Sequence, residues 1–165
     1  MATSCCHGTT RTYTTKSALT QITNIFSTPL LTMASLHPFL PQLVELLTSS
    51  ILSSSTTSRL NLVKAAAAAL FNLSRLSLAE SLSLGEDEIL SVVVALVESL
   101  KVMTQRKSSD TKELERLLVV CIGGYVILGK DSLAIKEVLE GIEAVDIING
   151  AGGSVSNEVI RLIKG

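Results

Sequence analysis

Residues 111–135 read TKELERLLVVCIGGYVILGKDSLAI. Apolar side chains recur in this segment every three or four residues, which is the spacing of one face of an α-helix; they are Leu114, Leu117, Leu118, Cys121, Ile122, Tyr125 and Leu128. We expect a helix that is capped by Asp110 or Thr111 and ends at Gly129. The pattern predicts one layer of a stacked helical array.

Two unusual features interrupt the apolar face of this helix. Gly123 and Gly124 are adjacent, and each Gly costs a helix about 1 kcal/mol relative to Ala. Two together indicate that another helix packs closely at this point. Arg116 is the single arginine of the segment and is flanked by Glu113 and Glu115. We consider it either a partner-binding residue or one member of an ion pair on a solvated edge.

The composition favours an aliphatic helical core. Hydrophobic residues make up 47% of the 165, but aromatic residues only 3%, and Trp is absent; helix-on-helix packing suits such a set. The net charge is −1, with five basic residues and one acidic residue in positions 1–76 and nine basic and fourteen acidic ones in 77–165. Basic residues are too sparse for a nucleic-acid footprint, so we expect no nucleic-acid partner.

The three cysteines do not suggest a disulfide framework. Cys5 and Cys6 are adjacent, and Cys121 lies on the apolar helix face, where a free Cys packs as a small hydrophobe. This usage predicts a reducing compartment, the cytoplasm, with the nucleus left open as well. Every long apolar run contains polar breaks, so we expect neither a transmembrane helix nor a membrane partner. The N-terminus lacks the apolar core of a secretory signal.

Few residues could serve in catalysis or metal binding. The Cys-Cys-His run at 5–7 has no further ligands near it in sequence, and His37 stands at a helix start, where it suits a capping or surface role. We therefore expect no metal site, no cofactor and no catalytic residue. The acids at 86–88 are explained as first-turn charges of a helix, and the glycine motifs of nucleotide-binding loops are absent. The sequence predicts a protein that is not an enzyme.

The whole chain predicts a succession of helices and no strand. We expect a disordered leader over residues 1–15 and one helical domain over 16–165. In the first half we expect helices at 16–26, from residue 38 onward and at 58–82, the last being the longest. A fourth helix begins at 86 and is followed by a polar hinge at 104–110. The remaining helices are expected at 112–128, from a cap at Asp131 to Leu139, and at 157–164. Loops are expected at 49–58 and at GAGG (150–153), with a turn within 142–150.

Short polar loops between these helices, and a register that recurs at roughly 45 to 55 residues, predict stacked helical repeats. We therefore expect an all-α, armadillo-like α-solenoid. A compact helical bundle is the alternative architecture.

Three segments, in order, resemble the C-terminal part of the PUL domain, the α-solenoid of the phospholipase-A2-activating protein family. ITNIFSTPL (22–30) is similar to that family's Asn-x-Phe element, and LNLVKAAAAALFNLSRL (60–76) to its Ala-rich helix ending in Asn-(Leu/Tyr)-Ser. LERLLVVCIGGYVIL (114–128) is similar to its Arg-Leu-Leu-Val-Ala-Leu-Gly-x-Leu helix. The resemblance covers residues 16–164. Full PUL domains are longer, so it implies a domain truncated at the N-terminus.

The resemblance implies a protein-binding role. PUL domains form a curved armadillo stack whose basic concave groove holds the acidic C-terminal tail of the hexameric AAA ATPase valosin-containing protein, in the ubiquitin pathway. Arg116 matches the Arg that opens the third element, and it is our first candidate partner-binding residue. Lys64 and Arg59 lie on or beside the Ala-rich segment without a family counterpart, and they are the other two candidates. Family members commonly carry an Arg at the position of Thr20, so the chain departs from the family pattern there.

Alternative functions follow from the same fold. The chain could be a generic armadillo or HEAT-type scaffold, fused in the full gene to a PPPDE-type thiol isopeptidase or a thioredoxin-like domain. It could also be an incomplete gene product, with an apolar terminal face that lacks a polar cap. The sequence leaves the oligomeric state open.

Overall fold

The structure is a computed structural model that describes residues 17, 21, 37–52, 60–80, 84–106 and 108–165. The predicted leader and most of the predicted helix at 16–26 lie outside these residues. The described part contains seven α-helices, two short 3₁₀ helices and no strand, which confirms the all-α prediction. The elements are η1 (His37–Phe39), α3 (Leu40–Leu52), α4 (Leu60–Glu80), α5 (Glu86–Arg106), η3 (Ser109–Thr111), α6 (Lys112–Leu128), α7 (Leu133–Gly141), α8 (Ala144–Ala151) and α9 (Ser154–Lys164).

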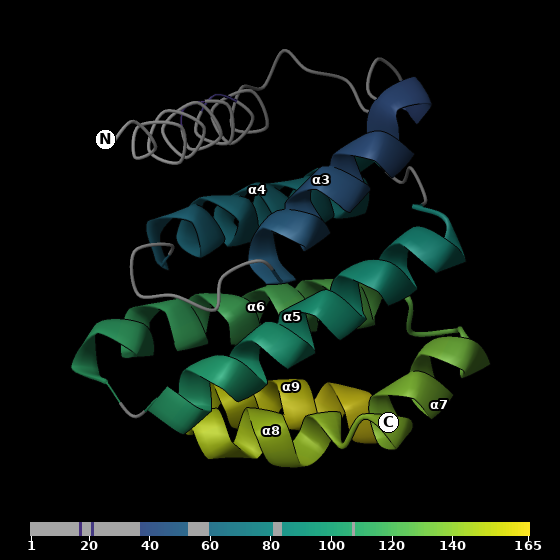
Figure 1. The fold of residues 1–165 in the computed structure, drawn as a ribbon. Helices are drawn as coiled ribbons and strands as arrows, with labels where there is room; N and C mark the ends of the chain where they lie inside the picture. Colours follow the sequence, from purple (N-terminus) through teal and green to yellow (C-terminus); the bar gives the residue numbers. More distant parts are fainter. Residues whose placement is uncertain (1–16, 18–20, 22–36, 53–59, 81–83, 107) are drawn as a thin grey trace, which may run out of the picture.

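The helices form three layers of paired helices (Figure 1). The α3–α4 pair packs on the α5–α6 pair, with α3 against α5 and α4 against α6. The α8–α9 pair covers the opposite side, with α8 against α5 and α9 against α6. The short α7 packs beside α5 and α8. The prediction of a stacked helical array is confirmed.

Helix α6 lies at the centre of the array and contacts α4, α5, α8 and α9. Its predicted apolar face is confirmed, since five of the seven residues are buried and Leu117 and Leu128 are half-buried. The helix ends where predicted, with Gly129 as the C-cap residue, whose N–H bonds the Tyr125 carbonyl oxygen at 3.0 Å. A helix that is apolar on most of its circumference needs neighbours on both sides, and the layers above and below supply them.

The glycine pair of α6 lies where two neighbouring helices approach it closely. A Cβ atom on Gly123 would lie 2.9 Å from Val159 Cγ2 of α9. A Cβ atom on Gly124 would lie 2.8 Å from Ser74 Oγ of α4. The close packing predicted for these positions is therefore confirmed, and it occurs on both sides of the helix.

Replacing Gly124 with leucine is expected to destabilise the protein. The better helix propensity contributes about 1 kcal/mol in favour of the variant, but crowding against Ser74 costs about 1–3 kcal/mol, and a leucine cannot avoid that contact. Chemical denaturation of Gly124→Leu and of the control Gly150→Leu would test this. Gly150 lies in α8 with open space around its Cβ position, so the control should be as stable as the parent or slightly more stable. A Gly124 variant as stable as the control would contradict the close contact.

Two buried side chains of α6 bond the backbone of α4. The Cys121 thiol donates to the Ala67 carbonyl oxygen at 3.2 Å, and the Tyr125 hydroxyl donates to the Leu70 carbonyl oxygen at 3.0 Å. Burial raises the pKa of the Cys121 thiol to about 12 and the pKa of the Tyr125 hydroxyl well above its usual value. Cys121 is thus a core residue, as predicted. The small side chains of the Ala-rich segment let α6 come this close to the α4 backbone.

The structure corrects the prediction for the Ser/Thr-rich segment after α3. We expected a loop from residue 49, but α3 continues to Leu52. The Thr48 and Ser50 hydroxyls donate to carbonyl oxygens one turn earlier, at 2.8 and 2.7 Å. These side chains therefore satisfy their hydroxyls on their own helix, which lets the helix continue. The remainder of the predicted loop, 53–58, lies outside the described residues.

Helix α5 is also longer than predicted. It begins at Glu86, as expected, but it continues to Arg106, three residues into the predicted hinge. The predicted 58–82 helix is therefore not the longest one of the described part, since α4 and α5 each have 21 residues. The apolar faces predicted for both are confirmed. They consist of Leu62, Ala66, Ala69, Leu70, Leu73 and Ser77 in α4, and Ile89, Val93, Leu96, Val97 and Leu100 in α5, all of which are buried.

The prediction was least accurate near the C-terminus. Ser132, not Asp131, caps α7; its hydroxyl accepts a hydrogen bond from the Ile135 N–H at 3.2 Å. Residues 142–150, predicted as a turn, contain most of the helix α8. Its Asp, Asn and Gly residues are poor helix formers, but Ala144 and Ile148 are fully buried, so packing determines its conformation.

The last helix begins earlier than predicted, at Ser154 in place of Asn157. The GAGG loop is correspondingly reduced to Gly152 and Gly153. Their φ angles are 71° and 93°, which L-residues with a side chain rarely adopt. These two glycines make the sharp turn that places α9 beside α8.

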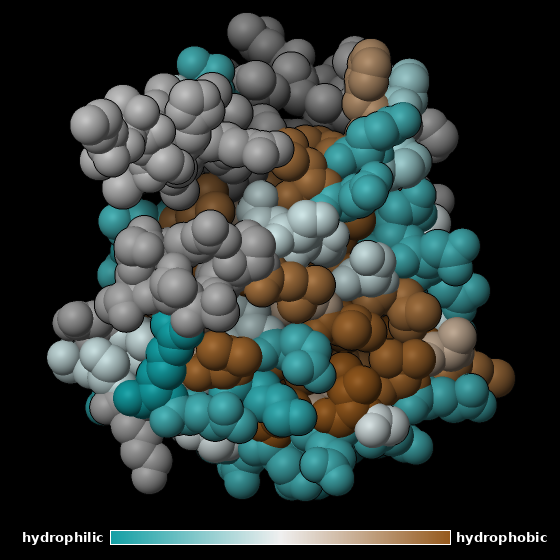
Figure 2. Space-filling model, viewed as in Figure 1, coloured by the Kyte–Doolittle hydropathy of each residue, from teal (hydrophilic) through white to brown (hydrophobic). Residues whose placement is uncertain are grey.

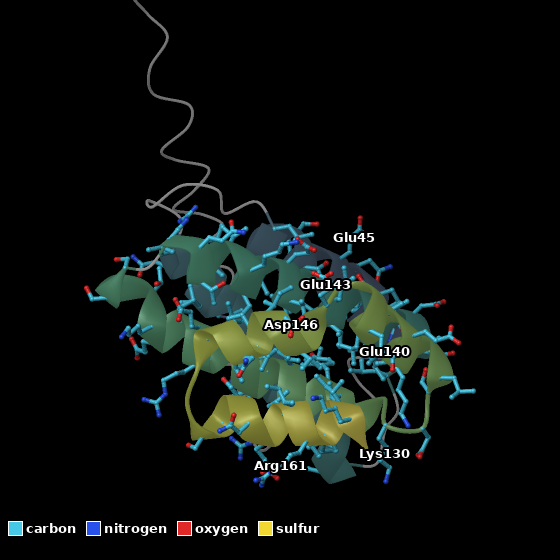
Figure 3. The ribbon with its side chains drawn as sticks, turned by 90° about the horizontal axis from the view of Figure 1, so that it is seen from below. Glu45, Lys130, Glu140, Glu143, Asp146 and Arg161 are labelled. Carbon is cyan, nitrogen blue, oxygen red and sulfur yellow. The ribbon has the colours of Figure 1, made fainter. Side chains whose placement is uncertain are left out.

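The outer surface of the last layer is polar. Seen from below, charged side chains surround α8 and α9, among them Glu143, Asp146 and Arg161 (Figure 3). In the space-filling view, hydrophilic side chains border the bottom of the molecule and apolar ones gather above them, in the region of α5 and α7 (Figure 2). The α8–α9 layer therefore presents a polar face on the side away from α5 and α6.

Within the described residues, the segment Leu60–Ala79 is long and apolar enough to cross a membrane by length and composition alone. Half of it is buried inside the protein. It packs against α3 and α6, so the buried half of this segment belongs to the core of the protein.

Candidate functional site

Two of the three predicted partner-binding residues lie near the N-terminal ends of α4 and α6. Arg116 lies in the second turn of α6 and is exposed to solvent. Lys64 lies in the second turn of α4, and its side chain is half-exposed. Arg59 and Thr20 lie outside the described residues. The structure therefore places two of the three candidates on neighbouring helices of adjacent layers.

Lys64 forms an ion pair that the sequence did not predict. Its Nζ lies 2.6 Å from Glu113 Oε2, so the pair joins the second turn of α4 to the first turn of α6. The side chains are 49% and 80% exposed. The hydrogen bond from Lys64, and then its positive charge, hold the pKa of the Glu113 carboxyl below its usual value. In the free protein, Lys64 is thus occupied by an internal carboxylate.

Arg116 has no ion-pair partner among the described residues, and the flanking acids are engaged elsewhere. Glu113 bonds Lys64, and Glu115 accepts a hydrogen bond from the Thr111 hydroxyl at 2.8 Å. Thr111 is the N-cap residue of α6, but its side chain makes no capping hydrogen bond, and its backbone is in the helical region in place of the extended one typical of a cap. Its hydroxyl lies 2.8 Å from both Glu115 Oε1 and the Ser108 carbonyl oxygen. The structure does not support Arg116 as one member of an edge ion pair.

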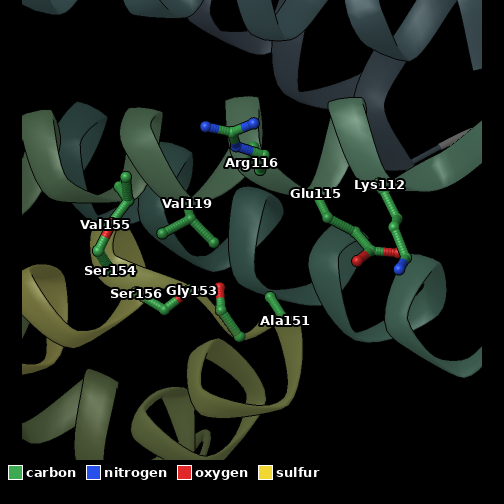
Figure 4. A pocket seen from close by; sticks show the side chains of 10 residues that line it. Lys112, Glu115, Arg116, Val119, Ala151, Gly153, Ser154, Val155 and Ser156 are labelled. Carbon is green, nitrogen blue, oxygen red and sulfur yellow. Dashed lines mark hydrogen bonds between the residues drawn. The ribbon is translucent and has the colours of Figure 1, made fainter.

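Arg116 also lines a hollow of about 350 Å³ between α6 and the α8–α9 turn (Figure 4). The lining residues from α6 are Lys112, Glu115, Arg116 and Val119, and residues 151–156 come from the end of α8, the turn and the start of α9. Two cationic side chains therefore face one acidic side chain around the hollow. The first-turn N–H groups of α9 lie at the same place, and Gly153, the N-cap residue, provides no side-chain cap. Helix N-termini favour negative charge, so the start of α9 can contribute to binding an anionic group in the hollow.

The Lys64–Glu113 ion pair and the hollow lie on neighbouring faces of α6. Successive helical residues are about 100° apart, so Arg116 lies on α6 between Glu113, which faces α4, and Val119, which faces the hollow. The Lys64–Glu113 pair, Arg116 and the hollow form one continuous surface, which we call the α6 N-terminal surface. The sequence predicts a loop at 150–153, but it does not indicate that this loop and Lys112 line a hollow beside Arg116.

Metal and thiol chemistry have no visible basis in the described part. No three His, Cys, Asp or Glu side chains converge there as metal ligands. The Cys-Cys-His run at 5–7 lies outside it. Cys121 is fully buried with a raised pKa, and such a thiol is a poor nucleophile.

Stacked helical layers with an exposed, charged surface are typical of helical-repeat modules that bind other proteins. The family model of the PUL domain matches residues 17–164, nearly the whole chain, and the chain belongs to this family. The predicted resemblance and the predicted armadillo-like fold are thereby confirmed. The PUL domain is a protein-binding domain and not a catalytic one. No curated protein and no solved structure matches the chain.

Proposed function

We propose that this PUL domain binds the acidic C-terminal tail of a valosin-containing-protein-type AAA ATPase, as an adaptor in ubiquitin-dependent processes. Membership of the PUL family supports this proposal. The observation that carries it is Arg116, a fully charged side chain that is exposed, unpaired within the described part and located at the edge of a hollow. The compartment that this function implies is the cytoplasm, with the nucleus as a second location.

The chemistry of the α6 N-terminal surface suits an extended acidic segment. A guanidinium binds carboxylates through two parallel N–H···O bonds, and the hollow beside Arg116 can accept a neighbouring side chain of the tail. Lys112 and the first turn of α9 add positive potential on the same side. The partner residues would lie across α6, from the hollow towards Lys64.

Fluorescence anisotropy with a labelled peptide of the ATPase tail tests the proposal. The tail peptide should bind the intact chain, and a matched peptide with its Asp and Glu residues replaced by Asn and Gln should bind much more weakly. The affinity should also fall as salt is raised, because exposed charge pairs are screened. Equal binding of both peptides, or binding of neither, would contradict the proposal.

A further inference from the structure

We infer that Glu113 is a built-in competitor for the acidic partner: it occupies Lys64 in the free protein and must be displaced when a partner carboxylate binds there. This inference rests on the proposed function and concerns the regulation of the same surface. It assigns a role to an acidic residue that would otherwise be expected to oppose binding. The role is to set the affinity and charge selectivity of the α6 N-terminal surface.

The contact has the geometry of a bound ligand. Glu113 Oε2 approaches Lys64 Nζ at 2.6 Å from a different layer of the stack, 49 residues away in the chain. A carboxylate from a partner would approach the same ammonium group at the same distance. Glu113 thus stands in for the carboxylate of the partner.

The exposure of the pair makes displacement easy. The Glu113 side chain is 80% exposed and that of Lys64 49%, and ion pairs exposed to this degree contribute little to stability because water screens them. The pair can therefore open without disturbing the layers, which are held by the buried contacts of α4 and α6.

Glu113 also affects Arg116. The two residues are three positions apart on α6, a spacing at which helical side chains are neighbours, so the negative charge of Glu113 lowers the positive potential around Arg116. A partner that brings a single carboxylate to Lys64 replaces the Lys64–Glu113 ion pair with another ion pair, so it gains little binding free energy. A partner that engages Lys64 and Arg116 together gains a new pair. Glu113 therefore favours tails that carry several acidic residues.

Three variants test the inference with the tail peptide described above. Glu113→Gln should bind the peptide about two- to five-fold more tightly than the parent, the range expected for releasing an exposed ion pair. The control Glu140→Gln removes the same charge from an exposed position on α7, and it should leave the affinity unchanged. In a Lys64→Gln background, Glu113→Gln should have a smaller effect, because its competition for Lys64 is gone and only its influence on the potential around Arg116 remains.

A peptide with one acidic residue tests whether Glu113 favours tails that carry several acidic residues. The ratio of its affinity to that of the full tail peptide should rise in Glu113→Gln. If the parent binds the tail and Glu113→Gln binds equally or more weakly, or if Glu140→Gln has the same effect as Glu113→Gln, the inference is wrong and the proposed function remains. If no variant binds any acidic peptide, the proposed function fails and the inference fails with it.

Discussion

Replacing Tyr125 with alanine is expected to lower the free energy of unfolding by about 3–5 kcal/mol, the range for large aromatic side chains removed from a packed core. Tyr125 is the largest of the fully buried side chains in the described part. It also crosses between layers, since its hydroxyl bonds the Leu70 carbonyl oxygen of α4. The variant leaves a cavity at the centre of the array and removes this bond. Urea denaturation followed by far-UV circular dichroism would measure the loss.

Tyr125→Phe separates the contribution of the buried ring from that of the hydrogen bond. It keeps the ring and removes only the hydroxyl, so we expect a loss of about 0.5–1.5 kcal/mol, the net contribution of one hydrogen bond. The Leu70 carbonyl lies within α4, where regular helix geometry supplies a second donor, which keeps the loss small. Equal stability of Tyr125→Ala and the parent would show that α4 and α6 do not pack as described.

Reversing the charge of Arg116 is expected to weaken binding of the acidic tail peptide by at least about 30-fold, on the order of 2 kcal/mol or more, the cost of losing one member of a hydrogen-bonded charge pair at an interface. Arg116→Glu also places a repulsive carboxylate beside the hollow. Arg116 is exposed, so the fold should be unaffected. Anisotropy titration measures the binding, and thermal denaturation verifies the fold.

Two further variants make the Arg116 result specific. Lys136→Glu introduces the same charge change at an exposed position of α7 and should alter the affinity little. Arg116→Lys keeps the charge but loses the planar, two-bond geometry, so it should give an intermediate affinity. If Arg116→Glu bound as tightly as Lys136→Glu, Arg116 would not contact the tail.

The central part of the fold could be predicted from the sequence because its local and tertiary preferences agree. In α6 the apolar spacing, the glycine pair and the stop at Gly129 all indicate the same helix, and the structure contains it. The Ala-rich α4 is equally consistent, since Ala favours the helix and also permits close packing. Helices of this kind can be recognised without knowledge of their neighbours.

The helices near the C-terminus could not be predicted as well because their neighbours determine them. Helix α8 has only eight residues and includes Asp146, Asn149 and Gly150. An isolated helix of this length is not stable in water. Its contacts with α5, α6 and α9 hold it in place. Such contacts join residues far apart in the chain, and no local pattern encodes them.

The candidate site was predicted only in part for the same reason. Arg116 was found through a sequence motif, and Lys64 through its position on the Ala-rich segment. The pairing of Lys64 with Glu113 depends on the stacking of α4 on α6, and the hollow depends on where the α8–α9 turn falls. Both features arise from the packing of layers, so a reading of single helices could not show them.

The central position of α6 has a consequence for how the molecule folds. In long helical-repeat proteins each unit touches only its neighbours, so one end can unravel while the other stays folded. The described part contains three layers, and α6 contacts α4 of the layer on one side and α8 and α9 of the layer on the other. Loss of either of these two layers would expose one flank of α6 and the apolar side chains that pack there. The described part should therefore unfold as a single cooperative unit, and its most slowly exchanging backbone amides should be those of α6.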